Sequence, residues 1–128
     1  MTAVPEKVRK AYETLSAFPV ATASPDGKPN LIYMTFLRMI DDETLELADN
    51  FFHKTRQNLE DNPWVAVTFW GPDTDGSYQV KGKAEIITEG PTYEECVAWV
   101  KENHDSLEPK ACVRVHVEEV YSGADRLA

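Results

Sequence analysis

The spacing of apolar and polar residues along the chain predicts a mainly β protein with a few short helices. In the last apolar segment Val113, Val115 and Val117 alternate with other residues, the period of two that marks a strand with one buried face. Strand patterns occupy six segments in all, residues 18–24, 30–40, 44–48, 64–70, 77–88 and 111–121. Helical spacing instead fits three segments, residues 5–17, 54–61 and 91–103.

Turn residues divide these strands at short intervals. The run Pro25-Asp26-Gly27-Lys28 predicts a hairpin between the first two strands, and Asp41-Asp42-Glu43 makes the next turn. Gly82, inside the fifth strand, predicts a bulge or bend. Six long strands joined by tight turns favour a small antiparallel β-barrel, a fold that offers ligand sites at its rims. The chain length of 128 residues suits a single domain over residues 1–128.

The amino-acid composition limits the kinds of partner and the cellular compartment that we expect for this protein. The formal net charge of −9 argues against nucleic acid and anionic membranes as partners. No apolar run approaches the ~20 residues of a membrane span. The first residues lack the apolar core of a signal peptide, so we expect a cytoplasmic protein.

The two cysteines, Cys96 and Cys112, have no spacing that suggests a metal site or a disulfide framework. We expect both to be reduced and buried, and we expect no metal. The sequence also lacks the motifs of serine hydrolases, phosphate-binding loops and dinucleotide folds.

The predicted helix over residues 54–61 carries its charges against the helix dipole. Lys54 and Arg56 lie in its first turn, where the dipole favours acids, and Glu60 and Asp61 lie at its end. A bound anion at the helix start, held by backbone N–H groups, Lys54 and the Thr55 hydroxyl, would explain this arrangement. The alternative is a solvated helix with unoptimised charges, which lowers helix stability by only about a few tenths of a kcal/mol per charged group.

Three segments of the chain resemble those of a known family. They are the opening hairpin at residues 19–29, the basic helix and following strand at residues 53–67, and the strand at residues 80–85. In this order the chain, from about Phe18 to Tyr121, resembles the split-barrel FMN-binding flavoproteins related to pyridoxamine 5′-phosphate oxidase. The resemblance implies a six-stranded antiparallel split β-barrel. It also implies a homodimer with FMN at the subunit interface and the FMN phosphate at the start of the basic helix.

The resemblance also implies which residues surround the cofactor. Lys54 and Thr55 correspond to phosphate-binding positions, and Arg38 corresponds to a basic residue near FMN and substrate. Asp49 either faces solvent or binds the ribityl hydroxyls, and Ser77 or Gln79 comes from the second subunit. The full set is Tyr33, Met34, Thr35, Phe36, Arg38, Ala48, Asp49, Asn50, Lys54, Thr55, Ser77 and Gln79. No catalytic residue is assigned.

Three functions stay open on the sequence. The resemblance implies a flavin-dependent oxidoreductase acting on a small molecule. A one-electron carrier is the alternative, because the acidic surface suits docking to a basic redox protein. The same barrel can also hold deazaflavin or haem, although His53 is the one histidine at the predicted site, and His104 is interpreted as a helix-end residue.

Overall fold

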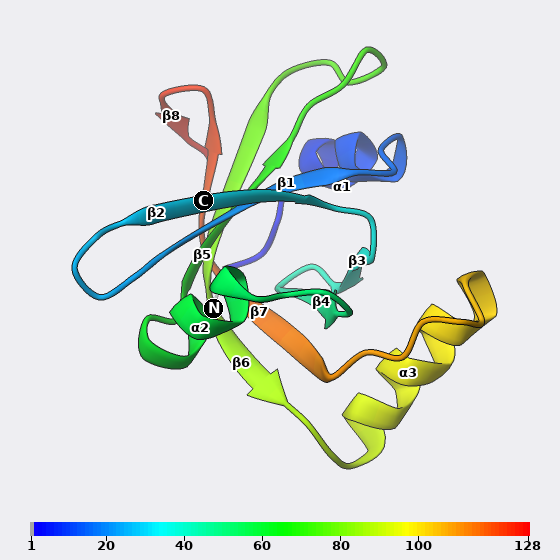
Figure 1. The fold of residues 1–128 in the computed structure, drawn as a ribbon. Helices are drawn as coiled ribbons and strands as arrows, with labels where there is room; N and C mark the ends of the chain where they lie inside the picture. Colours follow the sequence, from blue (N-terminus) through cyan, green and yellow to red (C-terminus); the bar gives the residue numbers. More distant parts are fainter. Residues whose placement is uncertain (1) are drawn as a thin grey trace.

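The computed structural model describes residues 2–128, which form one curled antiparallel sheet with three helices packed around it (Figure 1). The elements in chain order are α1 (Glu6–Glu13), β1 (Phe18–Ala23), β2 (Pro29–Met34), β3 (Leu37–Asp41), β4 (Thr44–Asp49), α2 (Lys54–Asp61), β5 (Trp64–Phe69), β6 (Tyr78–Ile87), α3 (Pro91–Asn103), β7 (Ala111–Ser122) and β8 (Asp125–Arg126).

The order of the strands explains how the barrel closes. Neighbours run β2-β1-β5-β6-β7-β4-β3, and β8 pairs with β7. The strands β2 and β3 are consecutive along the chain, yet they occupy the two opposite edges of the sheet. Residues 35–36 span these edges, and the backbone N–H of Ala48 donates to the Phe36 carbonyl at 3.0 Å. The predicted split barrel is therefore confirmed, with its split beside this connection.

The predicted strand over residues 30–40 is wrong as one element. The chain leaves one sheet edge at Met34 and joins the other at Leu37, so the segment forms two strands. With β8 also missed, the described residues form eight strands rather than six. The first helix ends at Glu13 rather than at residue 17, because the N–H groups of Thr14 and Leu15 donate to carbonyls three residues back and tighten the turn.

The strand β4 differs from its predicted half-buried pattern, since all six of its residues are buried. One face contributes Leu45 and Leu47 to the core inside the barrel. The other face lies under α3, where Ala48 packs with Cys96 and Val100 in a second, smaller core. Glu46 lies on this second face and is fully buried.

The bulge predicted at Gly82 is confirmed by a register shift between Lys81 and Gly82 in the pairing of β6 with β7. A Cβ at this position would lie 2.4 Å from the His116 carbonyl oxygen, so the close approach of the two strands requires glycine. Among the described residues no helix has the length and apolar character that crossing a membrane requires.

Candidate functional site

A cavity of about 400 Å³ lies beside the connection between β2 and β3. Its volume is typical of sites for small molecules and cofactors. The lining is mainly apolar and aromatic with a few polar side chains. It consists of Ile32, Tyr33, Met34, Thr35, Phe36, Ala48, Asn50, Phe51, Phe52, His104 and Leu107.

Three separate segments form the walls of this cavity. The first is the end of β2 with its connection to β3, the second runs from the end of β4 to Phe52, and the third follows α3. The third segment is fixed to the second, because the N–H of Lys110 donates to the Asp49 carbonyl at 2.8 Å. The Tyr93 hydroxyl also donates to the Pro109 carbonyl at 2.8 Å. These two hydrogen bonds, which lie outside the cavity, fix the position of its third wall.

Asn50 lines the cavity and carries a polar atom that lacks a partner within the described chain. Its Oδ1 is buried and accepts no hydrogen bond from residues 2–128. A buried acceptor left unpaired costs about 1–3 kcal/mol. An unpaired acceptor on a residue of the wall favours a bound molecule that can donate a hydrogen bond to it.

The start of α2 follows Phe52 by two residues. The backbone N–H groups of residues 54–56 meet no acceptor within the described chain, and His53 provides no side-chain cap. Lys54 is exposed there. Thr55 is buried, and its hydroxyl oxygen accepts from Asn30 Nδ2 at 3.0 Å, which leaves the hydroxyl proton free to donate. A helix start with unpaired N–H groups and a nearby cation is typical of an anion site.

Asp49 lies behind the cavity wall rather than in solvent, so the solvent-facing interpretation of this residue is wrong. Its carboxylate is fully buried and accepts from the Phe52 N–H at 3.0 Å and from Arg56 Nη1 at 2.8 Å. Lys110 Nζ lies 3.9 Å away. Arg56 also pairs with Glu60 at 3.5 Å. The unusual position of Arg56 in the first turn of α2 is thus explained by Asp49, while that of Lys54 is not.

Arg38 also has partners within the protein and does not line the cavity. Its Nε and Nη2 lie 2.8 and 2.7 Å from Glu46 Oε2. The guanidinium stacks on the Trp99 ring at 4.2 Å from the ring centroid, and Trp99 meets Phe36 edge to face at 5.5 Å. Since Phe36 lines the cavity, Arg38 supports the wall from behind.

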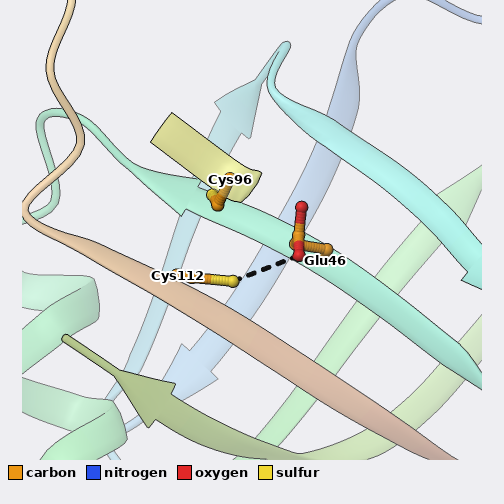
Figure 2. A group of neighbouring side chains, drawn as sticks. All are labelled: Glu46, Cys96 and Cys112. Atoms are coloured by element: carbon orange, nitrogen blue, oxygen red, sulfur yellow. Dashed lines mark hydrogen bonds between the residues drawn. The ribbon is translucent and has the colours of Figure 1, made fainter. Parts of the chain in front are cut away.

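Glu46 connects this support to a pair of buried thiols (Figure 2). Its Oε1 accepts from Arg114 Nε at 2.8 Å and from Cys112 Sγ at 3.2 Å. Both cysteines are free and buried, as predicted. A hydrogen bond with Cys96, burial and the neighbouring Glu46 raise the pKa of Cys112, which keeps this thiol protonated.

The ligating atoms of Glu46, Cys96 and Cys112 lie within 4.8 Å of one another, a grouping that their sequence spacing did not reveal. The Glu46 carboxylate already accepts N–H groups from two arginines, whose charges disfavour an added cation. We therefore interpret the cluster as a structural connection between β4, β7 and α3.

The structure brings together half of the residues that the sequence placed around the cofactor. The members that line the cavity are Tyr33, Met34, Thr35, Phe36, Ala48 and Asn50. Lys54 and Thr55 lie at the adjacent helix start, and Arg38 and Asp49 lie behind the wall. Ser77 and Gln79 lie before and on β6 and do not line the cavity of their own chain. Whether a second subunit brings them to the cofactor stays a prediction.

Sequence reasoning missed several residues of the wall. Phe51 and Phe52 form an aromatic pair outside any predicted strand, a signal that could have placed them at a site. His104 and Leu107 follow a helix that lies far along the chain, and no local pattern connects them to β2. Their position depends on how α3 packs against β4 and β7.

Comparison with known proteins identifies the family. The family model for pyridoxamine 5′-phosphate oxidase (PNPOx_N) matches residues 4–123. The chain belongs to this family.

Two relatives show how far the likeness extends. The chain is 36% identical to an uncharacterized protein of Methanocaldococcus jannaschii over 91% of this chain and 78% of that protein. It is 26% identical to the pyridoxine/pyridoxamine 5′-phosphate oxidase of Nostoc punctiforme over 84% of this chain and 54% of the oxidase. The chain therefore spans about half the length of the named oxidases that it matches.

Solved structures share the fold over nearly the whole chain. HupZ from Group A Streptococcus is 28% identical, with a TM-score of 0.85 and 98% of each chain covered. The fold alone is shared with three others. An FMN-binding protein from Syntrophomonas wolfei is 16% identical, with 91% of this chain and 83% of that chain covered and a TM-score of 0.73. HutZ, the heme storage protein from Vibrio cholerae, is 16% identical, with 94% of this chain and 95% of that chain covered and a TM-score of 0.72. An F420 reductase is 23% identical, with 92% of this chain and 98% of that chain covered and a TM-score of 0.70.

Proposed function

We propose that the protein binds FMN and acts as a flavin-dependent oxidoreductase on a small molecule. One observation carries the proposal: an apolar cavity with an unpaired amide oxygen lies next to a helix start with unpaired N–H groups. FMN has matching parts, since it joins a flat ring system to a phosphate through a polar chain. Membership of the pyridoxamine 5′-phosphate oxidase family supports the same assignment.

The residues present fit each part of FMN. The cavity walls at Phe36, Ala48 and Phe52 offer apolar surface for the ring, and Asn50 offers a hydrogen-bond acceptor. Lys54 and the N–H groups at the start of α2 would hold the phosphate. The flavin, when bound, supplies the redox chemistry, while the protein binds and orients it.

The phosphate assignment predicts a selective effect of Lys54→Ala. Losing one charge-assisted phosphate contact costs about 1.5–3 kcal/mol, so FMN should bind about ten- to a hundred-fold more weakly. Riboflavin, which lacks the phosphate, should bind almost as before. Fluorescence titration measures both affinities, and Lys10→Ala, at another exposed lysine on α1, is the matched control. Equal losses for FMN and riboflavin would remove the phosphate site from α2.

The cavity also predicts a second subunit. Tyr33 is 76% exposed and Phe51 is 79% exposed, and both line the cavity while facing solvent. Leu31, on the same face of the edge strand β2, is exposed as well. A partner that covers these side chains would enclose the flavin and bury apolar surface. Ser77 and Gln79 of that partner are the residues that the family resemblance places beside the cofactor.

We therefore expect a homodimer of twice the 14.5 kDa chain, about 29 kDa, by light scattering. Its interface should bury more than about 2,000 Å², the range of obligate dimers. Phe51→Ser should weaken the dimer and FMN binding together, because one apolar side chain serves both. A monomer that binds FMN tightly would contradict this arrangement.

Haem is the alternative cofactor with support from a specific residue. His104 lines the cavity, and a histidine is a common axial ligand of haem iron. The fold is shared with a protein described as a heme storage protein. Absorption of the purified protein separates the two cofactors, because haem gives a Soret band and FMN gives flavin peaks.

A further inference from the structure

His104 is the described cavity residue best suited to proton transfer. The chain leaves α3 after Asn103, and the exposed His104 is one of the residues that line the cavity. The other lining side chains are apolar, aromatic, hydroxyl or amide groups. An imidazole is the side chain that exchanges a proton most readily near neutral pH.

The structure fixes this histidine at three points. Its backbone N–H donates to the Val100 carbonyl at 2.8 Å, and its carbonyl accepts from the Leu107 N–H at 3.1 Å. Ser106 Oγ lies 3.0 Å from the ring Nδ1. The ring Nε2 has no hydrogen-bond partner among residues 2–128. One ring nitrogen thus has a partner within the chain, while the other is free to exchange a proton with a bound molecule or with water.

We propose that His104 is the catalytic proton donor for reduction of a carbonyl, imine or activated alkene in this cavity. The inference rests on the proposed function, which supplies the reduced flavin. The reduced flavin, when bound, would supply a hydride to one atom of the substrate double bond, and His104 would donate the proton on Nε2 to the other atom. The double bond becomes a single bond, the imidazole becomes neutral, and it regains its proton from water.

The inference separates an enzyme from an electron carrier. A carrier passes single electrons to a protein partner and needs no proton donor at the cavity. A histidine that only ends α3 would affect loop stability and nothing else. A catalytic His104 instead affects two-electron reduction of a small molecule and leaves one-electron transfer unchanged.

Stopped-flow oxidation of the FMN-loaded, dithionite-reduced protein tests the inference under anaerobic conditions. The two oxidants are 2-cyclohexen-1-one, which takes a hydride and a proton, and ferricyanide, which takes single electrons. In His104→Gln the rate with cyclohexenone should fall about 10²- to 10⁴-fold, the usual contribution of a general acid. The ferricyanide rate and the FMN affinity should stay within about twofold of wild type, well below that range.

Two variants act as controls. Ser106→Ala removes the contact to Nδ1 and should give a smaller loss with cyclohexenone alone. His116→Gln changes a histidine on β7 that pairs with Glu85 at 3.2 Å, outside the cavity, and should change neither rate.

The outcomes that overturn the inference are distinct from those that overturn the proposed function. Equal slowing with both oxidants in His104→Gln would make the residue structural. A His104→Gln protein that reduces cyclohexenone as fast as wild type would exclude the proton-donor role. A wild-type protein that fails to bind FMN in the preceding titration would overturn the proposed function, and the inference with it.

Discussion

Glu46→Ala is expected to lower the free energy of unfolding by about 3–5 kcal/mol, the usual cost of removing one partner from a buried ion cluster. The Glu46 carboxylate is fully buried and accepts from Arg38 and Arg114, whose side chains are 27% and 18% exposed. Without it, two largely buried guanidinium groups would face each other with no anion between them. The Cys112 thiol would also lose its acceptor.

Chemical denaturation measures this loss, and a surface carboxylate provides the comparison. Glu85 lies on β6, which is separated from β4 by β7, and it pairs with His116, but its side chain is 60% exposed. Glu85→Ala should therefore cost only about 0–1 kcal/mol, as exposed ion pairs do. A Glu46→Ala protein that loses no more stability than Glu85→Ala would show that the cluster is not a structural centre.

The same cluster shows what alternation could and could not predict. The pattern of residues 44–48 correctly predicted a strand, but it placed Glu46 on a solvated face. The burial of that face depends on α3, which is distant in sequence and covers it with Cys96 and Trp99. A charged residue at an alternating position indicates solvent only where no second layer covers the sheet.

The break between β2 and β3 also could not be predicted from the local sequence. Residues 30–40 contain β-branched, aromatic and long apolar side chains and no glycine or proline, so every local signal favours one strand. The chain nevertheless crosses from one sheet edge to the other at residues 35–36. Barrel closure is a property of the whole sheet, and the cavity lies at this crossing.

The sequence predicted the region of the candidate site better than it predicted the roles of individual residues there. The connection after β2, the end of β4 and the start of α2 meet around one cavity, as the family resemblance implied. The side chains of Arg38 and Asp49 lie nearby but have protein partners. These partners, Glu46 and Arg56, could not be chosen from the sequence among its 35 charged residues, 13 basic and 22 acidic.

Asp49→Ala is the second substitution for which we expect a large effect. It should lower the free energy of unfolding by about 3 kcal/mol and weaken FMN binding as well. The Asp49 carboxylate accepts from the Phe52 N–H and from Arg56, and thereby fixes the entry into α2. Removing it leaves the Phe52 N–H buried without an acceptor and Arg56 without its closest anion. The start of α2 should then shift relative to the cavity.

Glu60→Ala is the matched control, because Glu60 pairs with the same arginine. Its side chain is 55% exposed and its pair with Arg56 spans one helical turn, so its removal should cost about 0–0.5 kcal/mol and leave FMN binding unchanged. Asp49→Asn, which keeps an acceptor for the Phe52 N–H but removes the charge, should lie between the two. FMN affinity is measured without denaturant, at a temperature at which all variants are folded. A loss of affinity then reports the position of α2 and not unfolding. If Asp49→Ala loses stability but binds FMN as tightly as Glu60→Ala, the phosphate does not bind at the start of α2, because that is the element Asp49 positions.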